Sequence, residues 1–502
     1  MRTKLLGAAA GALLVALPAF AQTTLRIGLA EDPDVLDPTL ARTYVGRIVF
    51  ASICDKLFDI DEKLALVPQL ALSHQTSADG KTVTIRLREG VKFHDGEPFD
   101  AEAAKFSLER HLTMQGSFRR VEIAQVENIE VVDKATIRLH LKAPFAPLIA
   151  QLTDRAGMMV SPKAAKAAGD KFGTKPVCAG PYKFVERIAQ DRIVVERFAD
   201  YWDKGKVTID RIVYQPIQDS TVRLANLKSG GLDLIERVLA TDIGEVKKDP
   251  KLTLAMGTEL GYQGLTINVA NGEKANNPLA KNPKVRQAFE LALDRDAINQ
   301  VVFNGINQPN NQWVSSTNPY YMAKFPTPKR DVARAKTLIK EAGVATPIVL
   351  DFMVPNNPES RSVAEVMQSM TAEAGFDLKL RVVEFATSLN EGEKGNFQIY
   401  FLAWSGRTDP DGNIFSFATC KGPLNMGRFC DPKVDELLDK ARTVGALAER
   451  KAVYEAAAPA ILANGSVMYL YHRTLLFAQT NRLEGFRVYP DGLIRVTGLR
   501  LK

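Results

Sequence analysis

Alternation of apolar and polar residues predicts short strands in the first half of the chain. In KTVTIRLREG, Val83, Ile85 and Leu87 fall on one face and polar residues on the other, which is the period-two pattern of a half-buried strand. ATIRLHLK, from residue 135, alternates in the same way, and GPYKFVERIAQDRIVVERF, from residue 180, predicts a hairpin. Asp100 is placed to cap a helix that begins AEAAKF. Residues from about 60 to 175 therefore mix short strands with helices.

Helical periodicity becomes prominent in the second half. Val285, Ala288, Phe289 and Ala292 recur at helical spacing in KVRQAFELAL. Further on, PIVLDFMV predicts a strand, PESRSVAEVMQSMTAEAG a helix that stops at its glycine, and FDLKLRVVEF the next strand. A strand, a helix and a second strand in succession imply a parallel pair joined by a right-handed crossover. The fold class predicted for this half is α/β, with the methionines of the helix in the core.

The first 21 residues predict an export signal. Arg2 and Lys4 precede an apolar run, and Ala19-Phe20-Ala21 forms a small-x-small cleavage site. The run is too short to span a bilayer as a helix. Cleavage near Ala21 removes two positive charges, so the formal net charge falls from +7 to +5. We expect a soluble, exported mature protein that starts near Gln22.

Composition narrows the classes of function. A chain of 502 residues with 46% hydrophobic and 25% charged residues is typical of a globular protein of about three domains or subdomains. The small charge excess, without a basic run among aromatic residues, does not indicate nucleic-acid binding. We find no GxSxG, HExxH, GxxxxGK[ST] or GxGxxG motif, so we expect no catalytic residues, no metal site and no cofactor. DPDGN lacks the glycine and glutamate spacing of a calcium-binding EF-hand loop. An exported α/β protein without catalytic residues suggests a binding protein.

Four cysteines lie in the exported part, where disulfides form. Cys420 and Cys430 close a short segment, so we predict a disulfide between them. Cys54 and Cys178 are distant in sequence and cannot be paired from sequence alone.

Several stretches, in order, resemble the family 5 extracellular solute-binding proteins, the dipeptide- and oligopeptide-binding receptors of ABC importers. They are LAEDPDVLDPTL, LVPQLALSHQTSADGKTVTIRLREGVKFHDGEPFDAEAAKFSLER, VCAGPYKFVE, DYWDKGKVTIDRIVY, RLANLKSGGLDLI, KNPKVRQAFELALDRDAINQVVFNG and KRDVARAKTLIKEAG. The resemblance covers nearly the whole mature chain. It implies a hinged, two-lobe periplasmic binding protein of type II, with an extra subdomain in lobe I and the ligand enclosed between the lobes. On this basis we expect lobe I at 22–267 with an inserted subdomain at about 55–175, lobe II at 268–472, and a C-terminal return at 473–502. GYQGLTINV and the segment around His472 would be the two crossings.

The loop WSGRTDPDGN is where this chain departs from the peptide-binding pattern. In such relatives an acid three residues after the tryptophan holds the peptide ammonium, whereas here that position, after Trp404, is Arg407. An arginine repels an ammonium and suits a carboxylate. Asp409 or Asp411 could hold the amine after remodelling of the loop, or could instead pair with Arg407. The NP-x-x-R pattern of dipeptide binders implies that Arg361 holds the ligand carboxylate.

Two aromatic residues complete the predicted site. Trp404 is expected to line the cleft, with simple core placement as the alternative. Tyr44 matches a cleft-lining segment of relatives, and surface placement is the alternative.

The expected partners are a small-molecule or short-peptide ligand and the permease subunits of an ABC importer, with the binding protein acting as a monomer. The alternative ligand is a carboxylated non-peptide solute, which Arg407 favours. A secreted hydrolase and a peptide-binding chaperone or receptor without transport are the rivals from other classes.

Overall fold

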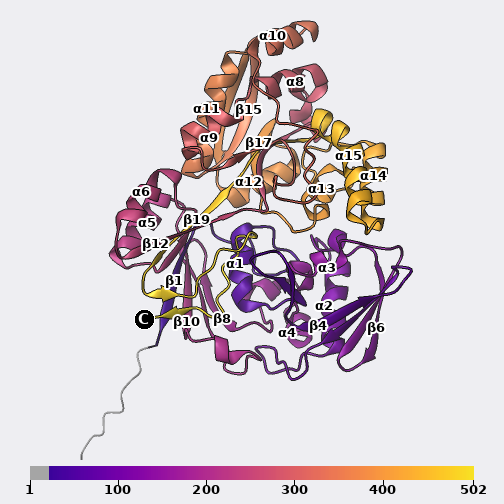
Figure 1. The fold of residues 1–502 in the computed structure, drawn as a ribbon, viewed down its shortest axis with the longest axis vertical. Helices are drawn as coiled ribbons and strands as arrows, with labels where there is room; N and C mark the ends of the chain where they lie inside the picture. Colours follow the sequence, from indigo (N-terminus) through magenta and orange to yellow (C-terminus); the bar gives the residue numbers. More distant parts are fainter. Residues whose placement is uncertain (1–21) are drawn as a thin grey trace, which may run out of the picture.

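The structure is a computed structural model that describes residues 22–502, so the expected signal peptide, residues 1–21, lies outside the described residues. A seven-stranded mixed sheet forms the first of two lobes (Figure 1). Its strands, in spatial order, are β12 (Leu252–Thr258), β19 (Thr474–Thr480), β11 (Leu234–Glu236), β1 (Thr24–Leu29), β10 (Arg211–Pro216), β9 (Arg192–Arg197) and β8 (Tyr182–Ile188). The last two form the antiparallel hairpin predicted from residue 180. Leu25 and Ile27 of the central strand are fully buried.

A four-stranded antiparallel sheet extends the first lobe. It contains β4 (Ala71–Thr76), β5 (Thr82–Leu87), β7 (Thr136–Leu141) and β6 (Val126–Asp133). In β5, Val83, Ile85 and Leu87 are buried and Arg86 is exposed, as the alternating pattern predicts. Asp100 accepts a hydrogen bond from the backbone N–H of Ala103 and so caps the helix that covers this sheet.

The second lobe is built on a six-stranded sheet. Its strands, in spatial order, are β14 (Gln308–Pro309), β18 (Val467–His472), β13 (Tyr262–Ile267), β17 (Ile399–Trp404), β15 (Ile348–Pro355) and β16 (Phe376–Val383). β15 and β16 pair in parallel, as predicted from the strand–helix–strand unit. The helix between them, α11 (Pro358–Ala372), buries Val363, Met367 and Met370 against the sheet, which confirms that these methionines belong to the core.

Helices cover both lobes, and two short strand pairs complete the fold (Figure 1). In the first lobe the helices are α1 (Tyr44–Ile53), α2 (Ala101–Thr113), α3 (Leu148–Gln151), α4 (Pro162–Ala168), α5 (Ser220–Ser229) and α6 (Ile243–Lys248). In the second lobe the others besides α11 are α7 (Pro278–Lys281), α8 (Pro283–Ala292), α9 (Arg295–Phe303), α10 (Val332–Glu341), α12 (Phe385–Lys394), α13 (Asp411–Ala418), α14 (Pro432–Thr443) and α15 (Leu447–Asn464). The short pairs are β2 (Phe58–Ile60) with β3 (Leu66–Pro68), and β20 (Leu483–Glu484) with β21 (Arg500–Leu501). Short 3₁₀ helices lie at Arg120–Glu122, Arg155–Gly157, Gly169–Thr174, Lys204–Lys206, Ala240–Asp242 and Glu273–Ala275.

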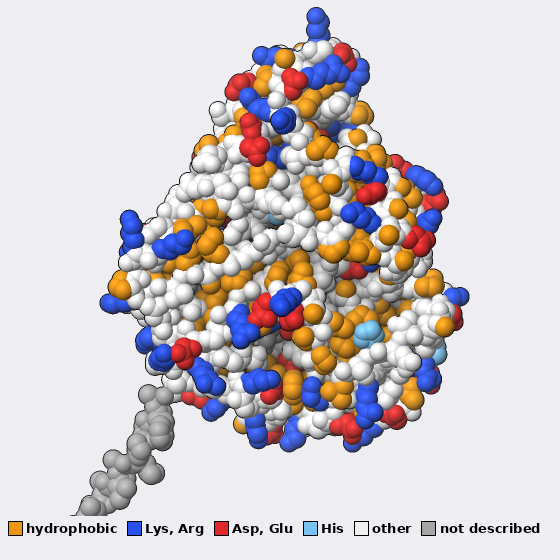
Figure 2. All heavy atoms as spheres, in the orientation of Figure 1, with side chains coloured by type: hydrophobic (Ala, Val, Ile, Leu, Met, Phe, Trp, Pro, Cys, Tyr) orange, Lys and Arg blue, Asp and Glu red, His pale blue; other side chains and the backbone are white. Residues whose placement is uncertain are grey.

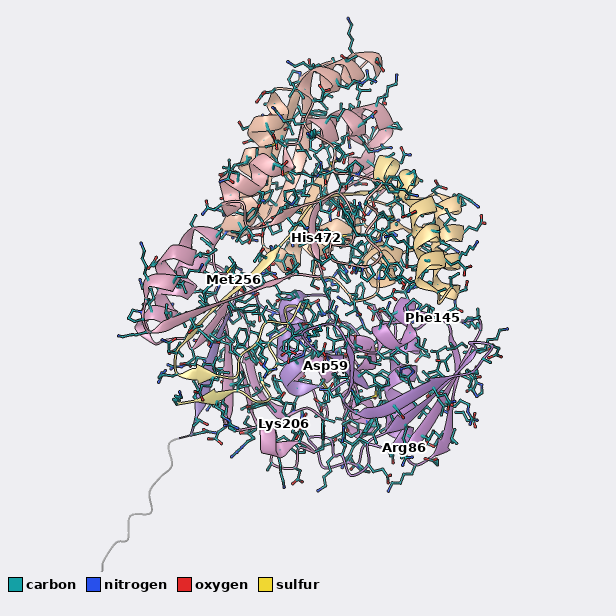
Figure 3. All side chains as sticks on the ribbon, in the orientation of Figure 1. Asp59, Arg86, Phe145, Lys206, Met256 and His472 are labelled. Carbon is teal, nitrogen blue, oxygen red and sulfur yellow. A yellow bond between two sulfur atoms is a disulfide. The ribbon has the colours of Figure 1, made fainter. Side chains whose placement is uncertain are left out.

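The chain passes twice between the two sheets. It leaves β12 at Thr258 and begins β13 at Tyr262, then leaves β18 at His472 and begins β19 at Thr474. The sequence assigned residues 262–267 to lobe I as a crossing segment, but they pair with β17 and β18 of the second sheet, so the crossing precedes them. The Nδ1–H of His472 donates to the carbonyl oxygen of Gly261, which ties the two crossings together at the junction of the lobes (Figure 3).

The surface drawn in Figure 2 carries basic and acidic side chains that are interspersed across both lobes. This distribution fits the mild charge excess of the sequence. Within residues 22–502, no helix is long and apolar enough to cross a membrane.

Candidate functional site

Two adjoining cavities lie between the lobes. One contains about 830 Å³ of space and the other about 910 Å³, and both are partly open to solvent. They share four wall residues, namely Tyr44, Arg237, Glu259 and Arg473. We call these four residues the shared wall. Two of them, Glu259 and Arg473, lie in the crossing segments, so the shared wall stands at the hinge.

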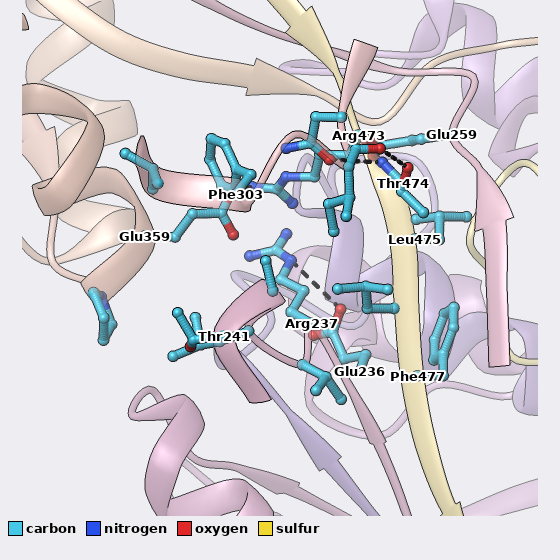
Figure 4. A pocket seen from close by; sticks show the side chains of 18 of the residues that line it. Glu236, Arg237, Thr241, Glu259, Phe303, Glu359, Arg473, Thr474, Leu475 and Phe477 are labelled. Carbon is cyan, nitrogen blue, oxygen red and sulfur yellow. Dashed lines mark hydrogen bonds and ion pairs between the residues drawn. The ribbon is translucent and has the colours of Figure 1, made fainter. Parts of the chain in front are cut away.

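Arginines of the shared wall are held by carboxylates from both lobes. Nη1 of Arg237 lies 2.7 Å from Oε1 of Glu31, and its Nε lies 3.5 Å from Oε2 of Glu236. Nη2 of Arg473 lies 2.9 Å from Oε1 of Glu359, the second residue of α11. Arg237 of the first lobe and Glu359 of the second point toward one another (Figure 4). Nearby carboxylates raise the pKa of both arginines against the opposing effect of burial, so both stay charged.

Backbone strain accompanies this cluster. Arg237 has a φ of +51°, a left-handed conformation that few residues other than glycine adopt. Such conformations persist where the surrounding structure over-determines them, and they concentrate at functional sites. The strained position directs the Arg237 guanidinium to within 5.3 Å of the centroid of the Tyr44 ring. The Tyr44 hydroxyl donates to the carbonyl oxygen of Gly492 at 2.6 Å.

Glu259 differs from the other carboxylates of the cluster. Glu31, Glu236 and Glu359 each lie within ion-pair distance of an arginine. Glu259 is only 5% exposed, and its Oε2 has no hydrogen-bond partner among residues 22–502. Burial raises the pKa of Glu259, against the opposing effect of Arg473 and Arg237.

Aromatic residues line the larger cavity. Trp404 contacts it, and its Nε1–H donates to Oδ1 of Asn413 at 3.0 Å, with the Phe417 ring 4.9 Å away edge-on. The apolar lining also includes Phe385, Leu389, Phe401, Leu424 and Met426. The loop after Trp404 approaches the first crossing so closely that a Cβ on Gly406, whose φ is +71°, would lie 2.3 Å from the carbonyl carbon of Leu260. Glycine is therefore required there.

Arg361 lies outside both cavities. It is exposed on α11, and its Nη2 donates to Oδ1 of Asn356 at 2.6 Å. It lines an open surface groove together with Asp219 and Glu365. The structure does not bring Arg361 together with Trp404 or Tyr44. The helix start on which the sequence interpretation relied is present, but the charged residue that it places in a cavity wall is Glu359.

Arg407 is buried and lines neither cavity of the site. Its Nε lies 3.1 Å from Oδ2 of Asp154 in the first lobe, and Arg47 Nη2 lies 2.6 Å from the same oxygen. Burial lowers the pKa of Arg407 to about 10, while Asp154 opposes that shift, so the guanidinium is charged at neutral pH. Arginines hold the pKa of Asp154 well below its usual value despite burial. Arg407 therefore joins the two lobes through an ion pair.

The two aspartates of the loop have other partners than Arg407. Asp409 accepts from both terminal nitrogens of Arg450, at 2.6 and 2.7 Å. Asp411 accepts from Arg442 at 2.7 and 3.0 Å. The internal pairing with Arg407 that the sequence left open does not occur, because each aspartate faces an arginine of the helices that follow the loop.

Disulfides join all four cysteines. Cys420 and Cys430 are bonded, as their spacing predicts, with Cα atoms 4.3 Å apart. Cys54 pairs with Cys178, with Cα atoms 4.9 Å apart, a pairing that the sequence did not specify. The 420–430 bridge closes the segment that follows α13, beyond the tryptophan loop.

Sequence reasoning missed the charged residues of the shared wall. Arg237 directly follows β11, and nothing in its local sequence marks it. Glu259 and Arg473 had a usable signal, because Glu259 lies two residues before one stretch expected to cross between the lobes and Arg473 lies next to His472 in the other. Hinge-adjacent residues face the cleft when the ligand is enclosed between two lobes.

Two α/β lobes, a double crossing and partly open cavities between the lobes are the features of a hinged solute-binding protein. Residues 65–425 match the family described as bacterial extracellular solute-binding proteins, family 5. The chain belongs to this family. Among residues 22–502, no group of three or more potential metal-ligating side chains is found.

Named relatives support the same assignment. The glutathione-binding protein GsiB of Pectobacterium atrosepticum is 30% identical over 98% of this chain and 97% of its own. The structure of AgaA from A. tumefaciens R10 in complex with agropinic acid is 28% identical, with a TM-score of 0.87 over 95% of this chain and 99% of that one. A dipeptide-binding protein from Pseudoalteromonas sp. SM9913, in complex with Met-Leu, is 24% identical with a TM-score of 0.88 over 95% and 100%. The matched family and the glutathione-binding relative are binding proteins rather than enzymes. The dipeptide-binding protein, at 24% identity, shows the shared fold alone.

Proposed function

We propose that this chain is the periplasmic receptor of an ABC importer that captures a peptide or peptide-like solute between its lobes. The observation that carries the proposal is the pair of joined cavities, whose shared wall presents charges of both signs. A zwitterionic solute needs both signs, whereas the aromatic and aliphatic lining suits apolar side chains.

In the proposed site, Tyr44 and Trp404 line the ligand, and Arg237 and Arg473 are the candidate carboxylate contacts. Arg361 and Arg407 are not proposed as ligand contacts, because Arg361 lies in an open groove beside the cavities and lines neither of them, and Arg407 pairs with Asp154. Asp409 and Asp411 brace the loop through their arginine partners.

The mechanism is capture followed by closure and delivery to the permease. A ligand drives closure only through its greater affinity for the closed arrangement. Contacts between the lobes already exist: Arg47 Nη1 donates at 2.9 Å to the Oγ of Ser405, which lines a cavity, and away from both cavities Gln151 Nε2 donates to Asp411 Oδ2 at 3.2 Å. The cavity supplies the additional contacts that make closure depend on ligand.

We further propose that the protein acts as a monomer without enzymatic activity, after cleavage of its signal peptide near Ala21. We place the boundaries between the lobes at the crossings, 259–261 and 473, and retain about 55–175 as a subdomain of the first lobe. The four-stranded sheet of that segment has its own hydrophobic cluster, which supports treating it as a unit.

A second candidate ligand is a carboxylated non-peptide solute. The AgaA structure, whose ligand is agropinic acid, favours it, since it shares 28% of its residues with this chain. The shared wall would accommodate the carboxylates of such a solute through the same two arginines.

Calorimetric titration with glutathione, Met-Leu and agropinic acid tests the proposal. The proposal predicts that at least one peptide binds with micromolar or tighter affinity and is recovered unchanged after incubation. Binding of agropinic acid alone would select the second candidate. Conversion of a bound solute into products would contradict the proposal that the protein only binds its ligand.

A further inference from the structure

We infer that Glu259 binds a primary ammonium group of the ligand, and that Gln263 forms hydrogen bonds with a peptide group next to that ammonium. The inference rests on the proposed function and specifies its ligand: a solute with a free amino terminus followed by a peptide group. Its basis is a set of unsatisfied polar atoms at the shared wall.

The first observation is the charge of the cluster. Six ionisable side chains meet at the shared wall. They are Glu31, Glu236, Glu259, Glu359, Arg237 and Arg473. Arg237 is paired with Glu31 and Glu236, and Arg473 with Glu359, while Arg42, which lines the same cavity, pairs with Asp34 and Glu393. The guanidinium groups beside the shared wall are therefore already engaged by other carboxylates, which leaves Glu259 for a cationic group of the ligand.

The second observation identifies where that cation sits. Glu259 is the carboxylate of the cluster that lacks an arginine partner, and its Oε2 is buried without a hydrogen bond in the described part of the chain. Its backbone N–H is satisfied by the carbonyl oxygen of Arg473 at 3.1 Å, so its main chain is fixed while its side chain is free to bind. A buried carboxylate without a partner is costly, and a bound ammonium removes that cost.

The third observation extends the site along the ligand. Gln263 lines the larger cavity and is only 1% exposed, yet neither its Nε2 nor its Oε1 has a partner among residues 22–502. A primary amide offers one donor group and one acceptor, which complement the C=O and N–H of a peptide group. Glu259 and Gln263 line the same cavity, beside the aromatic lining that receives a side chain.

This arrangement compensates for the missing acid in the tryptophan loop. The acid expected after Trp404 is replaced by Arg407, which is occupied by Asp154. The acid that faces the cavity comes instead from the first crossing segment. Selection for an amine is therefore retained in this chain but is moved from the loop to the hinge.

The test uses the mature protein and a synthetic library of dipeptides and tripeptides that includes glutathione, in free and N-acetylated forms. Compounds retained by the protein are identified by mass spectrometry, and their Kd values are measured by calorimetry. We expect wild-type protein to retain free compounds and to bind their acetylated forms at least ~30-fold more weakly, as for loss of a buried charge-assisted contact. Glu259→Gln should lose that discrimination, whereas Glu127→Gln, a change at an exposed site, should keep it.

A second readout separates ligand recognition from a structural role. Glu259→Gln removes an unpaired buried charge, so the ligand-free variant should unfold at the same temperature as wild type or higher. A large fall in that temperature would assign Glu259 to the structure of the hinge and overturn the inference. Equal binding of free and acetylated compounds by wild type would also overturn it while leaving the proposed function intact. Retention of no compound in either form would overturn both.

Discussion

Arg407→Met is predicted to weaken contact between the lobes without changing the sign of the charge on the ligands that the protein prefers. The Arg407 side chain is 6% exposed and that of Asp154 is 4% exposed, and the two residues come from different lobes. Methionine preserves much of the arginine's length and removes its charge. The substitution therefore removes one buried ion pair that spans the lobes.

The magnitude follows from what remains around Asp154. Breaking a buried pair costs about 3–5 kcal/mol when the remaining charge is left unpaired. Asp154 keeps Arg47 at 2.6 Å, and Arg155 Nε lies 3.4 Å from its other oxygen, so its charge stays compensated. We therefore expect a smaller loss, about 2 kcal/mol. Since 1.4 kcal/mol corresponds to a factor of ten, the ratio of closed to open protein should fall roughly 30-fold.

Small-angle X-ray scattering and calorimetry measure this change. The ligand-free variant should show a larger radius of gyration than wild type, and it should bind neutral and acidic peptides more weakly by the same factor, up to roughly 30-fold. Arg334→Met is the matched control, because Arg334 pairs with Glu341 at 3.0 Å within the second lobe and both side chains are well exposed. It should behave as wild type.

Two results would refute this reasoning. Unchanged scattering together with unchanged affinity would show that the ion pair does not bias closure. A selective loss of acidic ligands with unchanged scattering would show that Arg407 contacts the ligand carboxylate, as the sequence alone suggested.

Three further predictions concern stability and the outer surface. Replacing both cysteines of the Cys54–Cys178 bridge by alanine should lower the free energy of unfolding by about 5 kcal/mol, from the entropy of closing a segment of 124 residues, and urea unfolding that shows no loss would contradict this. Burial lowers the pKa of His111 to about 4, so the stability that its neutral form contributes is complete above pH 6.5 and falls as the pH drops toward 4. The fall is up to about 3 kcal/mol, and His111→Gln should flatten the dependence of the free energy of unfolding on pH over that range, whereas an unchanged dependence would contradict this. Arg361→Ala should change ligand affinity less than twofold, since the residue is exposed outside the cavities, and loss of binding in calorimetry would restore it as a carboxylate contact.

Local pattern predicted the elements well because their causes are local. The alternation around Ile85 arises from one buried sheet face, and Asp100 caps the helix that it directly precedes. The parallel pair β15 and β16 follows from the handedness of the intervening helix crossover. The Cys420–Cys430 bridge is likewise a short-range feature.

The ion pairs of the site could not be predicted from the sequence because the paired residues are far apart in the chain. Arg407 lies two and four residues from aspartates, but it pairs with Asp154, 253 positions earlier in the chain. Each nearby aspartate instead forms an ion pair with an arginine of α14 or α15, because the loop turns its carboxylates toward those helices. The four residues of the shared wall come from four distant regions of the sequence, so no local motif identifies it. Only the hinge-flanking positions of Glu259 and Arg473 could have pointed to it.

The crystal structure of the protein with the tightest-binding member of the peptide library tests the central claim most directly. The account predicts a ligand enclosed between the lobes, in contact with residues of both, with its ammonium nitrogen within hydrogen-bond distance of Glu259 and its carboxylate near Arg237 or Arg473. A ligand that contacts one lobe only, or that lies in the outer groove beside Arg361, would contradict it.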